Sequence, residues 1–182
     1  MTTGGRCIFS VNKIGGVLKD IEDDMIKTIL SVLNDMEKEI NTIKKTFLLD
    51  YTVESRLKEV GYLSKQQAHD LGCAGPFARA SGVRMDMRKR GYAAYAEIDF
   101  EPITSDIGDS YARCECRIEE LTQSIDIIRQ AAAKMTQGEI AVMAKGNPKG
   151  EYFMRVEQPR GEAIYYVKAN GTKFLDRMRV RT

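Results

Sequence analysis

Between residues 17 and 47 the sequence has the periodicity of a single long helix. Its apolar side chains recur every three or four positions with charged residues between them, at Ile21, Met25, Ile29, Val32, Met36, Ile40, Ile43 and Phe47. At ~1.5 Å per residue this predicts an amphipathic helix of roughly 45 Å. A helix this long with one apolar face needs partners, so we expect a bundle.

The segment 110–135 has the same periodicity and is expected to pair with the first helix. Its apolar stripe consists of Ile118, Leu121, Ile125, Ile128, Ala132 and Met135. Two short helices are predicted between the long ones, over 52–60 and after Ser64, where Gln67 would complete a capping box. The segment 72–100 contains several glycines among charged residues, which is typical of irregular structure.

After Gly138 the pattern changes to short apolar or alternating runs of strand length, at 140–143, 152–156 and 164–168. Asn170 and Gly171 favour a two-residue hairpin turn, because both tolerate positive φ. The sequence therefore predicts one α+β domain: a bundle around two long helices over about 1–137, and a small antiparallel sheet over 138–182.

Composition excludes several functions. The 182 residues have a formal net charge of +2, and basic residues alternate with acidic ones, so we expect no nucleic-acid partner. No apolar run is long enough to cross roughly 30 Å of hydrocarbon. The first residues lack the apolar region of a secretory signal, which predicts a cytosolic chain with reduced thiols.

No metal site is expected within the sequence. The four cysteines, Cys7, Cys73, Cys114 and Cys116, form no Cys-x-x-Cys pair, and His69 is the single histidine. A structural zinc site needs four donors at ligand spacing. Cys114 and Cys116 lie two apart on a predicted helix and point in different directions, so we expect ordinary buried or edge residues.

Two segments resemble a known family. Residues 71–89 read Leu-Gly-Cys-Ala-Gly-Pro-Phe-Ala-Arg-Ala-Ser-Gly-Val-Arg-Met-Asp-Met-Arg-Lys, and 108–113 read Gly-Asp-Ser-Tyr-Ala-Arg. They are similar to the large subunits of energy-converting, membrane-bound nickel-iron hydrogenases and to the related quinone-site (D-type) subunit of complex I. Residues 3–6 and 14–17 fit the same families. The resemblance implies that the chain is the middle part of such a subunit.

Residues 159–162 resemble the hydrogenase branch of these families. Hydrogenases have Pro-Arg-Gly where Pro159, Arg160 and Gly161 stand, followed here by Glu162, whereas the complex I subunit tends to have Pro-Lys-Gly-Glu. Asn147 to Glu151 mimic the complex I form eleven residues earlier. By this resemblance Arg160 is the catalytic residue, placing its guanidinium over the nickel-iron centre, where dihydrogen is split into hydride and proton.

A second charged group lies in 79–88 and has two interpretations. Arg79, Asp86 and Arg88, with Ser81, are compatible with a solvated loop whose surface ion pairs contribute under ~1 kcal/mol each. The resemblance implies instead that they face the iron-sulfur small subunit or line the cavity that serves quinone in complex I. Asp109 and Arg113 are expected to cap and anchor the helix at 110–135.

The resemblance also implies cofactors and partners. The nickel ligands of these families are two Cys-x-x-Cys pairs outside residues 1–182, so no cofactor is expected in the chain itself. The intact subunit would hold the nickel-iron centre, and its small subunit an iron-sulfur cluster. His69 does not correspond to the family's quinone-ligating histidine and is expected to be an exposed helix residue.

Three functional hypotheses follow. The first is a hydrogenase segment that couples electron transfer and proton reduction to ion translocation through membrane subunits. The alternative is a nickel-free, quinone-binding scaffold of an NADH-quinone oxidoreductase, and a third is a free-standing interaction protein. Both enzyme hypotheses imply a location at the inner face of the cell membrane, contacts with peripheral-arm subunits, and self-association of the separated chain.

Overall fold

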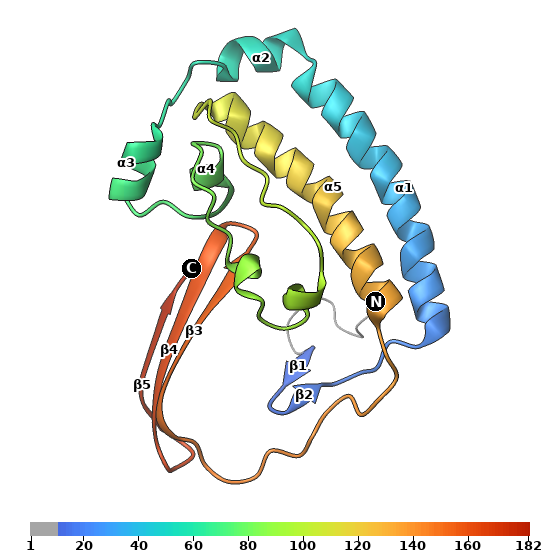
Figure 1. Cartoon of the computed structure of the whole chain (residues 1–182), viewed down its shortest axis with the longest axis vertical. Helices are drawn as coiled ribbons and strands as arrows, with labels where there is room; N and C mark the ends of the chain where they lie inside the picture. Colours follow the sequence, from blue (N-terminus) through green and yellow to red (C-terminus); the bar gives the residue numbers. More distant parts are fainter. Residues whose placement is uncertain (1–10) are drawn as a thin grey trace.

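The computed structural model describes residues 11–182, so Cys7 and the family match at residues 3–6 lie outside the described part. The elements are helices followed by a three-stranded antiparallel sheet, which confirms the predicted α+β class. Figure 1 shows the two long helices side by side and the sheet at the far end of the molecule.

The long helices are α1 (Asp23–Leu48) and α5 (Ser110–Lys134). They run antiparallel and pack together, as predicted, with Leu33 and Ile40 of α1 against Ile125 of α5 in one core cluster. An ion pair between Arg129 and Glu37 at 2.7 Å also joins the two helices. The pairing of the two helices is therefore confirmed.

Helix α1 begins six residues later than the apolar period predicts. Residues ahead of it form a small hairpin of β1 (Asn12–Lys13) and β2 (Gly16–Val17), and Gly15 takes a φ of +96° in the turn. The N–H of Val17 donates to the carbonyl of Ile140 at 3.0 Å. Val17 is therefore not helical, because its backbone pairs with a residue more than a hundred positions away in the sequence.

Both predicted short helices are present, and the second begins at its predicted cap. Helix α2 (Tyr51–Leu57) starts at Asp50, and α3 (Lys65–Asp70) starts at Ser64, which forms the predicted capping box with Gln67. His69 is exposed on α3, as predicted. Asp109 caps α5, since its carboxylate accepts the N–H of Ala112 at 2.8 Å and that of Glu59 at 2.9 Å.

The segment between α3 and α5 is largely irregular, as predicted. It contains only α4 (Gly75–Arg79) and the 3-10 turns η1 (Met87–Arg90) and η2 (Tyr95–Glu97). Ala80 packs against Ala112 and Cys116 of α5. Burial raises the pKa of the Cys116 thiol to about 11, so this cysteine is an unreactive core residue.

The sheet consists of β3 (Lys149–Gln158), β4 (Gly161–Asn170) and β5 (Leu175–Arg181) in that order. The predicted two-residue turn at Asn170 and Gly171 is wrong, because Ala169 pairs with Leu175 and a longer loop intervenes. The Asn170 side chain accepts the N–H of Thr172 at 3.0 Å and so extends the turn. The strand expected at 140–143 is reduced to one bridge between Gly16 and Ala141.

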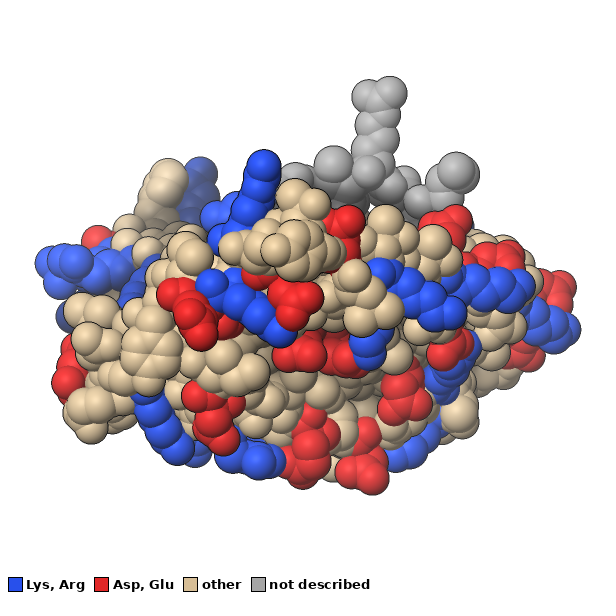
Figure 2. All heavy atoms as spheres, turned by 90° about the horizontal axis from the view of Figure 1, so that it is seen from above, with Lys and Arg blue, Asp and Glu red and all other residues tan. Residues whose placement is uncertain are grey.

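Much apolar surface remains exposed on the described residues. Val32, Met36, Ile43 and Phe47 are exposed along α1, and Leu121 and Ile128, expected in the core, are exposed on α5. The face in Figure 2 has acidic and basic side chains interleaved without a continuous basic band. None of the helices in residues 11–182 is both long and apolar enough to cross a membrane.

Candidate functional site

Arg79, at the end of α4, is the centre of a buried ionic cluster. Its side chain is 1% exposed, and its guanidinium donates to Glu120 of α5 at 2.8 Å and to Glu157 of β3 at 2.8 Å. It also donates to the carbonyl of Met85 at 3.0 Å and lies 3.7 Å from Asp86. One planar fork thus connects α4, α5, β3 and the segment before η1.

Asp86 and Arg88 complete the cluster. Both oxygens of Asp86 accept hydrogen bonds from the Arg88 guanidinium, at distances from 2.6 to 3.2 Å. Arg88 also lies over the ring of Phe100, with 4.9 Å to the ring centroid, and donates to Gln123 at 3.3 Å. We call Arg79, Asp86, Arg88, Glu120 and Glu157 the ionic cluster.

The burial of these charges excludes one of the two interpretations of 79–88. Arg79, Asp86 and Arg88 are all buried, so the solvated-loop interpretation is wrong. The reason is long-range: α5 and β3 supply carboxylates that make burial of the arginines tolerable. Ser81 is also buried, and its hydroxyl has no hydrogen-bond partner among the residues that the structure describes.

The pKa values in the ionic cluster move in opposite directions. Burial raises the pKa of Glu120, and the charge of Arg79 only partly opposes this. Burial would also raise the pKa of Asp86, but hydrogen bonds and charge from Arg88 hold that pKa below its usual range. The fully ionised cluster has two positive and three negative groups, so a proton on Glu120 would make it neutral.

The lowered pKa of Asp86 predicts sensitivity to acid. A carboxyl whose pKa is lower in the folded state contributes stability above its ordinary pKa, and loses it as pH falls through the folded value. We expect urea midpoints of the wild-type chain to drop steeply below about pH 4. Asp86→Asn should lower the midpoint at pH 7 and flatten this drop, unlike Asp24→Asn at an exposed position.

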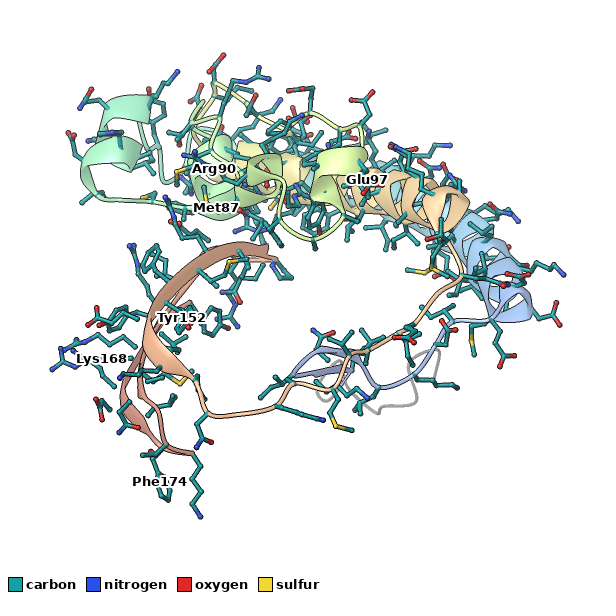
Figure 3. All side chains as sticks on the ribbon, turned by 60° about the horizontal axis from the view of Figure 1, so that its bottom comes forward. Met87, Arg90, Glu97, Tyr152, Lys168 and Phe174 are labelled. Carbon is teal, nitrogen blue, oxygen red and sulfur yellow. The ribbon has the colours of Figure 1, made fainter. Side chains whose placement is uncertain are left out.

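A cavity of about 450 Å³ adjoins the ionic cluster. Arg79, Arg88, Glu120 and Glu157 line it, together with Leu121, Ser124 and Arg117 of α5, Tyr95, and Gln158 and Pro159 ahead of the β3–β4 turn. Figure 3 shows this end of the sheet close to η1, where Met87 donates its N–H to Glu157 at 2.9 Å. The cavity therefore joins the two charged motifs of the sequence.

The Pro-Arg-Gly motif forms the β3–β4 turn. Arg160 is exposed there, while Gly161 is buried and has a φ of +129°. A Cβ on Gly161 would lie 2.6 Å from the backbone nitrogen of Gly75, so the turn presses against the start of α4. Glu162 forms an ion pair with Arg155 rather than joining the ionic cluster.

Sequence reasoning missed Glu120, Glu157 and Tyr92. The hydroxyl of Tyr92 accepts the N–H of Glu157 at 3.0 Å and fixes that end of β3. A signal for Glu120 existed, because it continues the stripe of Ala112 and Cys116 at steps of four on the buried side of α5. An acid on a buried stripe needs a cationic partner.

The described residues do not fit a nickel-iron centre. Residues 11–182 contain no group of three or more histidine, cysteine or acidic side chains placed to hold a metal ion. Nickel and iron in such a centre need clustered thiolate donors. A metal centre of this kind would therefore need donors from outside residues 11–182.

The sequence of the chain matches a family of oxidoreductase subunits. Residues 1–147 match the family described as the 49 kDa subunit of respiratory-chain NADH dehydrogenase. The chain belongs to this family, which contains the D-type subunits of complex I.

Individual relatives give the same result. The chain is 37% identical, over 99% of its length, to the C/D subunit of NADH-quinone oxidoreductase from Phocaeicola vulgatus, of which it covers 36%. It is 34% identical over its whole length to the D subunit of F(420)H(2) dehydrogenase from Methanosarcina mazei, covering 51%. It is 35% identical to the D subunit of NADH-quinone oxidoreductase from Desulfitobacterium hafniense, covering 50%. The chain thus spans about a third to a half of these relatives.

These comparisons support the alternative hypothesis better than the hydrogenase hypothesis. The relatives are subunits of NADH-quinone oxidoreductases or of F(420)H(2) dehydrogenase. The hydrogenase interpretation depends on the tripeptide of Pro159, Arg160 and Gly161, and three residues are a weaker criterion than similarity over the whole chain.

Proposed function

We propose that the chain forms the central part of a D-type subunit of a complex I relative, in a membrane-associated oxidoreductase that reduces a quinone. The observation behind this proposal is the ionic cluster beside a cavity, in a chain of this family. Reduction of a quinone to a quinol takes two electrons and two protons. A wall of the reaction chamber therefore needs groups that hold or release protons.

Glu120 is the proposed proton-holding group. It lines the cavity, and because burial raises its pKa, it binds a proton at higher pH than an ordinary carboxyl group. Arg79 and Arg88 hold the surrounding carboxylates in place. Arg160, exposed at the β3–β4 turn, is proposed to face the redox centre or the neighbouring subunit, with Pro159 and Gly161 fixing its backbone.

The proposed partner is an iron-sulfur small subunit that delivers the electrons, followed by other peripheral-arm subunits and, through them, ion-pumping membrane subunits. The exposed apolar residues of α1 and α5 support this, because such surface is usually covered in a complex. We infer a cytoplasmic position at the inner face of the membrane. The separated chain is proposed to self-associate through the same surface.

A nickel-iron hydrogenase of the energy-converting type is the second candidate. The observation that favours it is the Pro-Arg-Gly turn next to the cavity, with Arg160 exposed and free to extend over a reactive centre. Its nickel ligands would belong to parts of the subunit outside this chain.

One preparation tests both candidates. The complex containing the full-length subunit is purified and assayed for quinone reduction with NADH and with F(420)H(2), for nickel content, and for hydrogen evolution from reduced viologen. We expect quinone reduction without stoichiometric nickel. Stoichiometric nickel with hydrogen evolution would establish the hydrogenase instead.

A matched pair of variants tests the role of Glu120 in the same assay. Glu120→Gln removes the ionisable group beside the cavity and should lower quinone reduction per assembled complex. Glu119→Gln changes the adjacent residue of α5, which pairs with Lys44 on α1. Equal rates in the two variants would count against the proton-holding role.

A further inference from the structure

Within residues 11–182, β5 is an edge strand of the sheet and pairs only with β4. The strand order is β3-β4-β5, and every residue from Leu175 to Arg181 is exposed. Figure 3 shows the β4–β5 hairpin, with Phe174 near its tip, extending away from the helices. An exposed edge strand presents free N–H and C=O groups that can pair with another strand.

Three arginines lie on one face of this edge. Arg177, Arg179 and Arg181 occupy alternate positions of β5, so their side chains point to the same side at intervals of about 7 Å. Opposite them on β4 are Lys168, Tyr166 and Ile164. Glu151, across from Lys168 on β3, already pairs with that lysine at 2.9 Å. Arg177 and Arg179 have no ion pair with any residue in 11–182. Arg181 donates a hydrogen bond to the carbonyl of Gly72 at 3.3 Å, so it is the least available of the three.

The charge of the sheet differs from that of the rest of the chain. Residues 149–182 contain eight basic and four acidic side chains, a net charge of +4, whereas the whole chain has +2. The remaining residues therefore have a net charge of −2. The sheet segment is thus the positive part of an otherwise slightly acidic chain. The arginine face of β5 contributes three of its eight basic side chains, which favours an acidic ligand.

The other face of β5 is apolar. Met178 and Val180 are 55% and 48% exposed and alternate with the arginines. A strand pairing with β5 would therefore meet positive charge on one face and apolar surface on the other. This alternation suits an extended peptide with acidic and apolar residues in turn, and a nucleic acid has no such two-sided pattern.

We propose that β5 is a docking edge for an extended acidic segment of a partner protein, which adds a fourth strand to the sheet. Main-chain hydrogen bonds to β5 supply affinity. Acidic side chains opposite Arg177, Arg179 and Arg181, and apolar ones beside Met178 and Val180, supply specificity and register. This proposal is independent of whether the intact complex reduces a quinone or evolves hydrogen.

Three labelled ligands test the proposal on the full-length chain by fluorescence anisotropy. They are a nine-residue peptide of alternating Glu and Val, a scrambled peptide of the same composition, and a single-stranded oligonucleotide. We expect the alternating peptide to bind at least tenfold more tightly than the other two, and more weakly at higher salt. Equal binding of the scrambled peptide or the oligonucleotide, or no binding at all, would overturn the proposal.

Matched variants and hydrogen exchange locate the site. Replacing Arg177, Arg179 and Arg181 with Gln should weaken peptide binding at least tenfold, whereas Gln at Lys145, Lys149 and Lys173 removes the same charge elsewhere and should have a small effect. The bound peptide should also slow amide exchange within β5. If the bound peptide leaves amide exchange in β5 unchanged, strand addition is wrong. The arginines would then attract the acidic peptide without any backbone pairing at β5. The exchange measurement uses the wild-type chain.

Discussion

Replacing Arg79 with methionine should lower the free energy of unfolding by ~3–5 kcal/mol, the usual cost of removing one partner from a buried ion pair. The change leaves the Glu120 and Glu157 carboxylates without the guanidinium that donates to both at 2.8 Å. Domains of this kind are stable by only about 5–15 kcal/mol. A large share of the native stability should therefore be lost.

Urea denaturation followed by circular dichroism measures this loss. The control is Arg84→Met, a few residues along the chain, where the arginine is exposed and pairs with an exposed Glu101 at 3.2 Å. That pair should contribute under ~1 kcal/mol. Equal losses for the two variants would mean that the ionic cluster does not stabilise the fold.

A double variant separates the charge effect from the loss of packing. In Arg79→Met with Glu120→Gln, one of the two stranded carboxylates is neutral, so part of the lost stability should return. The two changes should therefore be non-additive, as is usual for residues in contact. Strict additivity would show that Arg79 and Glu120 act independently.

The local features of the fold were predictable from the sequence. The helix period of α1 and α5, the caps at Ser64 and Asp109, and the strands β3 and β4 depend on residues within a few positions of each other. Features that depend on distant pairing were not predictable. The late start of α1 follows from the bond of Val17 to Ile140, and no local pattern indicates it.

In the candidate site, too, the features that depend on distant residues were not predictable from the sequence. Family resemblance pointed to Arg79, Asp86 and Arg88, but charge alone favoured a solvated loop. Their burial depends on Glu120 and Glu157, which lie 41 and 78 residues from Arg79 in the sequence. Pattern analysis of one sequence identifies a buried acid on a helix stripe, but it does not show which cation meets it.

Gly161 connects the turn motif to the fold. The residue has a φ of +129°, and a Cβ there would lie 2.6 Å from the nitrogen and 2.7 Å from the Cα of Gly75. Gly75 in turn has a φ of +68°, and its own Cβ would lie 2.3 Å from the carbonyl oxygen of Arg160. Two backbones are thus in direct contact, and only glycine at both positions permits it.

Gly161→Ala should therefore destabilise the chain more than any other single-methyl addition in the sheet, by about 3 kcal/mol or more from backbone strain and overpacking together. Gly171→Ala provides the strain without the contact, because its φ is +85° and the nearest atom is 3.9 Å away. It should cost about 1 kcal/mol. Gly138→Ala meets nothing within 4 Å among the described residues and is the neutral control.

The order of the three losses, measured by urea denaturation, tests the contact itself. If Gly161→Ala and Gly171→Ala cost the same, strain alone explains the motif glycine and the contact with Gly75 is not tight. If Gly161→Ala lowers the free energy of unfolding clearly more than Gly171→Ala, the turn that contains Arg160 packs tightly against α4. Through α4 it is then connected to Arg79. The exposed arginine of the turn and the ionic cluster are then parts of one rigid site, because the same short helix begins at Gly75 and ends at Arg79.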